Sequence, residues 1–254
     1  MRITEITDGI IDEAVNPENI DLSSFKVKSE LNPKIFDSNQ KMHPELKSRL
    51  IMIADDFFDT LELPWVDVTD ITLTGSLANY NWSRFSDVDL HIMIDYNEVD
   101  DNESLVSEYL SAKKNLWNEK HDIKIFGYDV ELYVQDMNEE HVSTGVYSVM
   151  WDDWLVKPEK GNPKLDAKKI KQKAAGIIDS YDSLIDAYYQ GEFDKVIRRI
   201  KTTKEKIKKL RQAGLDREGE YSYENITFKV LRRVGLLDKL AELETLAYDK
   251  SLSM

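Results

Sequence analysis

The sequence contains no cysteine, which excludes disulfide bonds and metal sites built on thiolates. It also has no run of 18 apolar residues, and its first residues lack the continuous apolar segment of a secretory signal peptide. Only four histidines occur, and their positions show no spacing typical of a zinc site. These absences predict a protein with no membrane attachment, in a reducing compartment such as the cytoplasm.

Positive charge is scarce in the first part of the chain. The net charge is −14, but residues 161–254 hold 20 Lys and Arg against 15 Asp and Glu, so residues 1–160 carry a net charge of −19. Such acidity disfavours non-specific binding of nucleic acid. An anionic substrate of the first part would therefore need a bound metal, or the basic second part, for its attraction.

Prolines, glycines and polar stretches divide the chain into three parts. Residues 1–42 are polar and irregular and predict an extended N-terminal arm. Residues 43–157 alternate between helical and strand patterns, whereas residues 164–254 contain four amphipathic helical stripes. The predicted fold class is α/β (α+β), with a small mixed sheet flanked by helices and followed by a C-terminal helical domain.

The middle part has six predicted elements. Helical periodicity predicts helices over residues 44–63 and 102–119, and alternation predicts strands over residues 66–74, 87–95, 122–126 and 129–135. The last two strands form a hairpin. Further on, the segment 144–155 carries four large side chains at helical separations, which indicates a packed core stripe or a base-stacking surface.

The strongest motif lies between residues 71 and 95. Asp87 and Asp89 alternate with apolar residues, so both lie on one face of a half-buried strand, roughly 7 Å apart. Two carboxylates at this spacing can hold a common cation, and their oxygens favour Mg²⁺ or Mn²⁺. Upstream, Gly75 permits a tight turn whose N–H groups, with the Ser76 hydroxyl, form a small anion-binding concavity. A phosphate-binding turn beside a metal-binding pair indicates phosphoryl or nucleotidyl transfer.

A strand, a Gly-Ser pair, ten residues from Leu77 to Ser86 and an Asp-x-Asp in a second apolar strand resemble the signature of the DNA polymerase β-like nucleotidyltransferase superfamily. The resemblance covers about residues 45–135. It implies a mixed nucleotidyltransferase sheet and two divalent cations, Mg²⁺ or Mn²⁺. It also implies transfer of an NMP from an NTP to an acceptor hydroxyl, with release of pyrophosphate.

The resemblance further implies a third carboxylate on a strand beside the Asp-x-Asp strand. Glu131, flanked by Val130 and Leu132, matches this pattern best, and Asp129 on the same strand face is the alternative. The predicted catalytic and metal-binding residues are thus Asp87, Asp89 and Glu131. Gly75 and Ser76 are predicted to hold the β- and γ-phosphates of the NTP.

Several features leave the acceptor open. The connection from Leu77 to Phe85 departs from the arginine- and glycine-rich loops of many relatives, so a nucleic-acid 3′ end, a small molecule, another nucleotide and a protein hydroxyl all stay possible. Arg84 and His91 lie near the motif but are more often structural or solvated. The helix predicted after Gly191 is rich in Lys and Arg, which indicates either a solvated face or a phosphate-binding surface. The alternative from another class is a catalytically silent module with this fold, in a viral or regulatory assembly.

Overall fold

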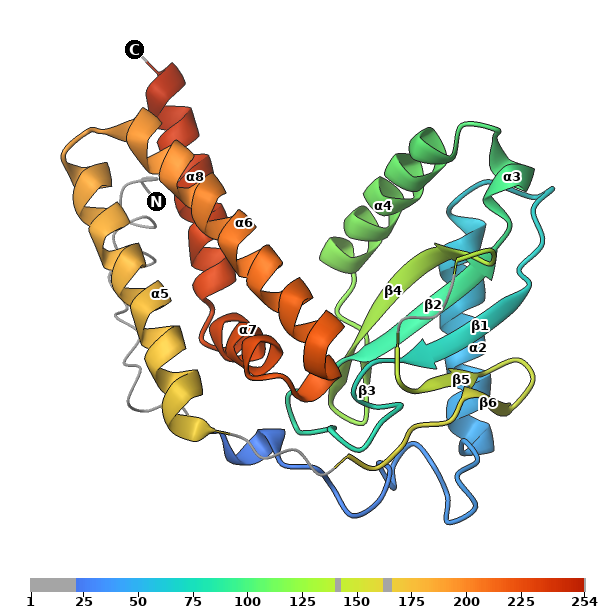
Figure 1. The fold of residues 1–254 in the computed structure, drawn as a ribbon. Coiled ribbons are helices and arrows are strands. Elements are labelled where there is room, and N and C mark those ends of the chain that lie inside the picture. Colours follow the sequence, from blue (N-terminus) through green and yellow to red (C-terminus); the bar gives the residue numbers. More distant parts are fainter. Residues whose placement is uncertain (1–21, 140–142, 162–165, 254) are drawn as a thin grey trace. The chain divides into compact units, whose positions relative to one another are not determined.

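The computed structural model describes residues 22–139, 143–161 and 166–253. The chain is divided into two compact units (Figure 1), one from Ser23 to Asn162 and one that includes Pro163 to the C-terminal end. We call them the sheet unit and the helical unit. A six-stranded mixed sheet with helices, followed by a helical C-terminal region, confirms the predicted fold class.

The sheet unit alternates helices and strands. Its elements are η2 (Ser23–Phe25), α2 (Pro44–Asp59), β1 (Asp70–Thr74), β2 (Val88–Ile94), α3 (Tyr96–Val99), α4 (Glu103–Lys120), β3 (Lys124–Ile125), β4 (Tyr128–Asp136), β5 (Val146–Ser148) and β6 (Asp153–Val156). The strand order is β3-β4-β2-β1-β5-β6. Among the strand pairs of the described residues, only the central β2–β4 pair is parallel, and β3 and β4 form the predicted antiparallel hairpin.

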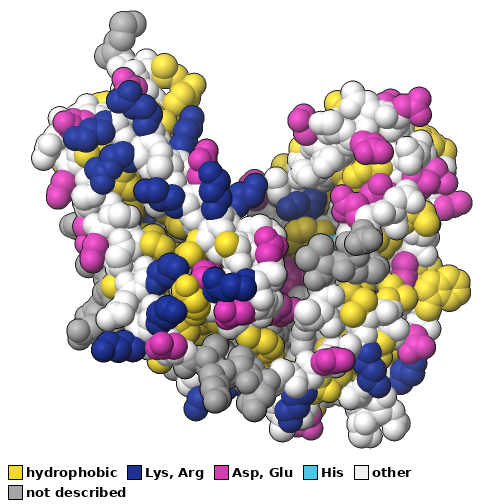
Figure 2. All heavy atoms as spheres, in the orientation of Figure 1, with side chains coloured by type: hydrophobic (Ala, Val, Ile, Leu, Met, Phe, Trp, Pro, Cys, Tyr) yellow, Lys and Arg dark blue, Asp and Glu magenta, His cyan; other side chains and the backbone are white. Residues whose placement is uncertain are grey.

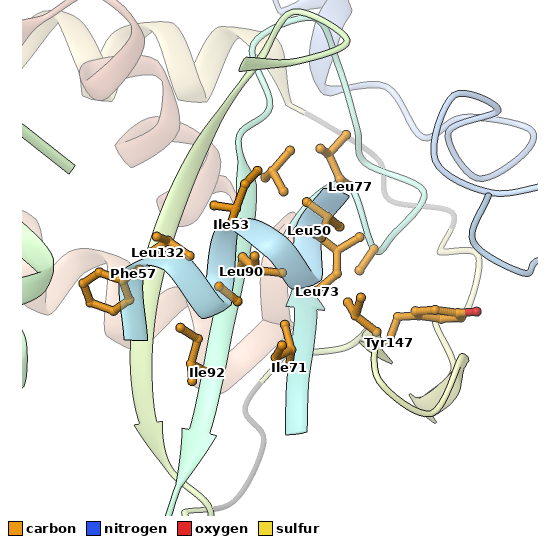
Figure 3. Packing of buried hydrophobic residues seen from close by; sticks show 14 of the residues in the cluster. Leu50, Ile53, Phe57, Ile71, Leu73, Leu77, Leu90, Ile92, Leu132 and Tyr147 are labelled. Carbon is orange, nitrogen blue, oxygen red and sulfur yellow. The ribbon is translucent and has the colours of Figure 1, made fainter. Parts of the chain in front are cut away.

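The apolar face of the sheet packs against α2. Leu50, Ile53 and Phe57 recur at helical spacing, and they lie over Leu90 of β2 and Leu132 of β4 (Figure 3). All five side chains are buried. Because side chains alternate along a strand, burial of this face turns the aspartates of the motif to the opposite face.

Helix α4 completes the apolar layer. Its Trp117 ring lies 5.5 Å from the ring of Phe57 in an edge-on arrangement. Asn118 forms two hydrogen bonds with the backbone of Leu132, donating from Nδ2 to the carbonyl oxygen at 3.1 Å and accepting the N–H at Oδ1 at 3.2 Å. The side chain of Asn118 thereby occupies backbone groups of β4 beyond the short pairing with β3.

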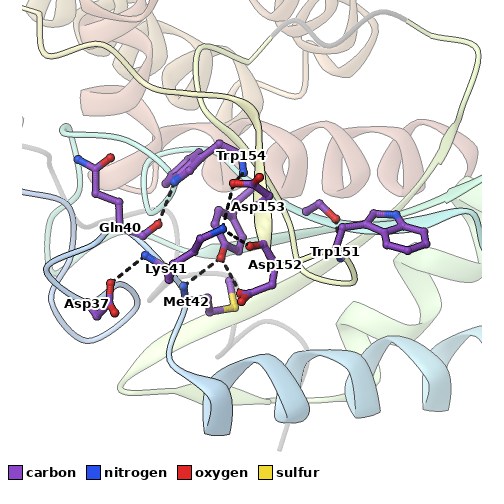
Figure 4. Close-up of polar contacts among 10 residues, drawn as sticks. Asp37, Gln40, Lys41, Met42, Trp151, Asp152, Asp153 and Trp154 are labelled. Atoms are coloured by element: carbon purple, nitrogen blue, oxygen red, sulfur yellow. Dashed lines mark hydrogen bonds and ion pairs between the residues drawn. The ribbon is translucent and has the colours of Figure 1, made fainter.

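Residues 23–42 belong to the sheet unit and bury five apolar side chains, Phe25, Leu31, Ile35, Phe36 and Met42. Polar contacts tie the same segment to the β5–β6 hairpin (Figure 4). The Met42 N–H donates to the Tyr147 hydroxyl at 3.1 Å, the Trp154 indole donates to the Gln40 carbonyl at 2.9 Å, and Lys41 pairs with Asp153 at 3.1 Å. This packing differs from an extended arm, and residues 1–21 of the predicted arm lie outside the described residues.

The aromatic segment near residue 150 forms a hairpin, so its helical spacing was misleading. Tyr147 of β5 is fully buried, and the Trp154 ring of β6 stacks 5.0 Å from the ring of Phe36. Between the strands, Asp152 has φ 57° and Trp151 is 72% exposed. Separations of three, four and seven residues arise in a tight hairpin as well as in a helix. The core interpretation therefore holds for Tyr147 and Trp154.

The helical unit contains α5 (Ala167–Tyr189), α6 (Phe193–Glu218), η3 (Gly219–Tyr221), α7 (Tyr223–Arg233) and α8 (Leu236–Leu252). Asp166 and Ser222 cap α5 and α7, each accepting the N–H three residues ahead. Arg217 of α6 donates two hydrogen bonds of 2.9 Å to the buried Glu224 carboxylate of α7. Within the described residues, no helix has the length and hydropathy needed to cross a membrane.

Candidate active site

The turn after β1 requires glycine, which has no side chain, at position 75. Gly75 has φ 70°, in the left-handed region that glycine tolerates best. A Cβ at this position would lie 1.9 Å from Oδ2 and 2.9 Å from Cγ of Asp89. The Asp89 carboxylate therefore lies directly over the turn, and glycine is required there both by the backbone conformation and by this contact.

Ser76 connects the turn to the end of the long loop. Its hydroxyl donates to the Ser86 hydroxyl at 2.7 Å, and Ser86 Oγ also accepts the Ser83 N–H at 2.9 Å. Within the loop, Leu77 and Ala78 are fully buried in the core. The ten residues between the Gly-Ser pair and the first aspartate are thus a fixed connection that closes on itself at Ser86, one residue before Asp87.

Strand pairing brings two of the predicted acids to adjacent positions. Asp89 of β2 is the register partner of Glu131 on the parallel neighbour β4, and of Thr74 on the antiparallel neighbour β1. Directly paired residues on neighbouring strands share a face and have Cα atoms about 5 Å apart. Asp87 precedes the first residue of β2 by one position and follows the same alternation.

A polar network holds the third acid. The Tyr133 hydroxyl donates to Oε2 of Glu131 at 2.5 Å. The Tyr133 ring stacks on His91, with ring centroids 4.8 Å apart, and the Lys114 ammonium lies 4.9 Å from its centroid. His91 Nδ1 is in turn 2.9 Å from Oε1 of Gln135. His91 therefore contacts the network as a support for Tyr133.

Tyr133 was not among the predicted site residues. The available signal was its position two residues after Glu131, because residues i and i+2 of a strand lie on the same face. Arg84 is exposed, and its guanidinium carbon lies 4.6 Å from the centroid of the Phe85 ring.

Asp129, the alternative third acid, has a different partner. It is exposed and forms an ion pair with Lys124 of β3, which also pairs with Asp122 at 3.0 Å. Hydrogen bonds to Asp129, and then to Asp122, raise the pKa of Lys124. The contact occupies Asp129 at the hairpin end of β4, whereas Glu131 lies beside Asp89.

The carboxylates of the predicted acids do not meet, although their backbone positions are adjacent. In residues 22–139, 143–161 and 166–253, no group of three or more His, Cys, Asp or Glu side chains is close enough together to hold a metal ion. The register places Asp89 and Glu131 side by side, but the Asp89 carboxylate is turned toward Gly75 and that of Glu131 toward Tyr133.

Comparison with known proteins gives little beyond this geometry. No protein-family model matches the chain, and no curated protein matches it. A solved structure of a STING-associated CdnE c-di-GMP synthase from Capnocytophaga granulosa is 14% identical, over 98% of this chain and 99% of that chain, with a TM-score of 0.20. A TM-score this low does not establish a shared fold.

Proposed function

We propose that this protein is a metal-dependent nucleotidyltransferase that moves an NMP from an NTP to an acceptor hydroxyl. The observation that carries the proposal is the pairing of Asp89 with Glu131 on adjacent parallel strands, beside a glycine turn that the Asp89 carboxylate covers. A carboxylate pair next to a tight glycine turn suits a substrate that brings phosphates and a divalent cation together.

The carboxylate donors fit a hard divalent cation such as Mg²⁺ or Mn²⁺. Asp87, Asp89 and Glu131 would hold the ions, which when bound would neutralise triphosphate charge and lower the pKa of the acceptor hydroxyl. Since the described carboxylates do not form a three-membered group, we propose that binding requires rotation of the Asp89 side chain toward Glu131.

The residues of the chain would divide the remaining work. The backbone N–H groups after Gly75 and the Ser76 hydroxyl would bind the β- and γ-phosphates. The acceptor oxygen forms a bond to the α-phosphorus, and the bond from that phosphorus to the oxygen bridging to the β-phosphate breaks. Pyrophosphate leaves, and the hydroxyl proton passes to the Glu131 carboxylate, which Tyr133 orients. Rate enhancement of this kind comes mostly from positioning and electrostatics.

The test is incubation of the purified protein with each α-³²P-labelled NTP, Mg²⁺ or Mn²⁺, and separate acceptors of the four candidate kinds. Pyrophosphate release and transfer of label to the acceptor are both scored. Asp89→Asn and Glu131→Gln should each lower the rate by several orders of magnitude, because each removes a charged ligand while preserving shape.

Asp129→Asn is the matched control. It removes one carboxylate charge from the same face of β4, but from a residue whose partner is Lys124. We expect its turnover to stay within about threefold of wild type, since this change does not touch the paired acids. Wild-type turnover in Asp89→Asn would contradict the proposal, and a loss confined to Asp129→Asn would move the third acid by two positions.

A catalytically silent module remains the second candidate, and the separation of the acid side chains is the observation that favours it. The two candidates differ in a measurable way. A silent module binds NTP without releasing pyrophosphate with any acceptor, and its affinity for Mg²⁺ is unchanged in Glu131→Gln.

A further inference from the structure

A groove of about 520 Å³ lies between α5 and α6 of the helical unit. Four cationic side chains line it: Lys173 of α5, and Arg198, Arg199 and Lys206 of α6. None of the described residues that line it is acidic. Figure 2 shows Lys and Arg side chains gathered over this part of the helical unit. The groove is therefore a concentrated positive surface on a chain whose net charge is −14.

The cations form a row along the helix. Arg198, Thr202 and Lys206 are spaced four residues apart, so they follow one another on a single face of α6. At 1.5 Å per residue, Arg198 and Lys206 are about 12 Å apart along the axis. Charges spread over this distance match an elongated anion with several charged groups better than a single phosphate.

These cations differ from Lys195 and Lys204 of the same helix in lacking acidic partners. Lys195 pairs with Glu192 at 2.5 Å, and Lys204 pairs with Glu244 at 2.6 Å. Among the described residues, no carboxylate lies within ion-pair distance of the four groove cations. Like charges brought together without counter-charges repel one another, and an anionic ligand would relieve that repulsion.

One groove cation is already fixed in position. The guanidinium of Arg199 donates to the Ser183 hydroxyl at 2.6 Å and to the Ser183 carbonyl at 3.4 Å. Apart from the four cations, the lining side chains are hydroxyl-bearing or aliphatic, with Ile177 and Ile207 among them, and none of the described lining residues is aromatic. Without an aromatic surface on which bases can stack, the groove suits a phosphate backbone more than nucleobases.

We propose that the α5–α6 groove binds the backbone phosphates of a single-stranded nucleic acid without sequence preference. The groove volume is that of a nucleotide-sized segment, which favours a single strand over a duplex. The row of cations accounts for at least two phosphate contacts. This binding is separate from the proposed transfer reaction, because it needs neither NTP nor a divalent cation.

The test is fluorescence anisotropy with a fluorescein-labelled oligothymidylate of about 12 nucleotides. Titrations are made with EDTA, without NTP, at salt concentrations from about 50 to 200 mM. The groove variant is Arg198→Gln with Lys206→Gln, and the matched control is Lys195→Gln with Lys204→Gln. Both double variants remove two positive charges from α6, but only the first removes them from the groove.

Loss of two phosphate contacts should lower the slope of log affinity against log salt by about 1.4. At 0.1 M salt, this change of slope corresponds to about 25-fold weaker binding. The control should bind within about threefold of wild type, since its cations are neutralised by Glu192 and Glu244. Circular dichroism checks whether both variants are folded.

Three results would overturn the proposal. The first is no salt-dependent binding by wild type, and the second is equal weakening in both double variants. The third is that a duplex of the same length binds wild type as tightly as the single strand does and is weakened equally by the groove variant. Because the assay contains no NTP or metal, failure here leaves the proposed transfer untouched, and an inactive enzyme leaves this inference untouched.

Discussion

Gly75→Ala should destabilise the sheet unit through two separable effects. Alanine at φ 70° costs about 1–2 kcal/mol, because its Cβ crowds the backbone in the left-handed region. In addition, the new Cβ would lie 1.9 Å from Oδ2 of Asp89, so that the carboxylate must leave its position. Displacing it costs about another 1 kcal/mol in strain and lost contacts.

An Asp89→Ala background separates these effects. Truncation removes Oδ2 and Cγ and leaves only the Asp89 Cβ, at 3.4 Å from the new methyl group, which is an ordinary contact distance. Gly75→Ala should then cost only the backbone term, about 1–2 kcal/mol. The coupling between the two positions should be about 1 kcal/mol, within the usual range for residues in contact.

Urea unfolding monitored by tryptophan fluorescence is the assay. All five tryptophans lie between Trp65 and Trp154, in the sheet unit, so the signal reports on that unit alone. Gly127→Ala is the control, because Gly127 has φ 87° but nothing lies within 4 Å of its added Cβ. It should show the backbone cost and no coupling to Asp89. Equal costs of Gly75→Ala in both backgrounds would refute the placement of the Asp89 carboxylate over the turn.

Three further predictions concern single contacts. Tyr133→Phe should lower kcat by about 10- to 100-fold with an unchanged KM for NTP, because Glu131 loses its hydrogen-bond donor, and an unchanged kcat in steady-state assays would exclude that role. Gly214→Ala should destabilise the helical unit although alanine is the better helix former, because its Cβ would lie 2.6 Å from Cβ of Glu224. Gly176→Ala should stabilise the unit by about 1 kcal/mol, because the space around its added Cβ is open. Thermal melts followed at 222 nm measure the stability of both variants. Burial raises the pKa of Glu224, but hydrogen bonds from its tyrosine and arginine neighbours outweigh it and lower the pKa overall. The Arg217–Glu224 pair therefore stabilises the protein above about pH 4.5, and this contribution is lost on acidification below that pH. Thermal melts of Glu224→Gln should accordingly be less sensitive to pH in that range than melts of wild type.

Sequence periodicity was informative wherever one face of an element is buried. The alternation around Asp87 and Asp89 predicted both the strand and the shared face, because burial of Val88 and Leu90 forces the aspartates to the other side. Helix α2 was predicted for the same reason. The exact partner of Asp89 on β4 was not predictable, since the register of a parallel pair depends on packing across the whole sheet.

Two kinds of feature were hidden in the sequence. The segment of residues 22–42 reads as polar because its apolar residues have no regular period, yet Ile35 and Phe36 are almost fully buried. Irregular segments bury side chains through turns and backbone hydrogen bonds, which leave no periodic signal. The directions of the Asp89 and Glu131 carboxylates are likewise rotamer choices, and tertiary neighbours that no local sequence pattern encodes set them.

Because the Asp89 carboxylate covers the turn, its position affects both phosphate binding at the turn and cation binding by the acids. A phosphate at the turn after Gly75 would approach a carboxylate that already covers that turn, and two anions at contact distance repel each other strongly. The repulsion is relieved in either of two ways, by rotation of Asp89 toward Glu131 or by a cation between the carboxylate and the phosphate. Rotation toward Glu131 brings two acids together, and that arrangement is itself favourable only with a cation. Both routes lead to the same requirement, so in this site nucleotide binding and divalent-cation binding should be thermodynamically coupled rather than independent.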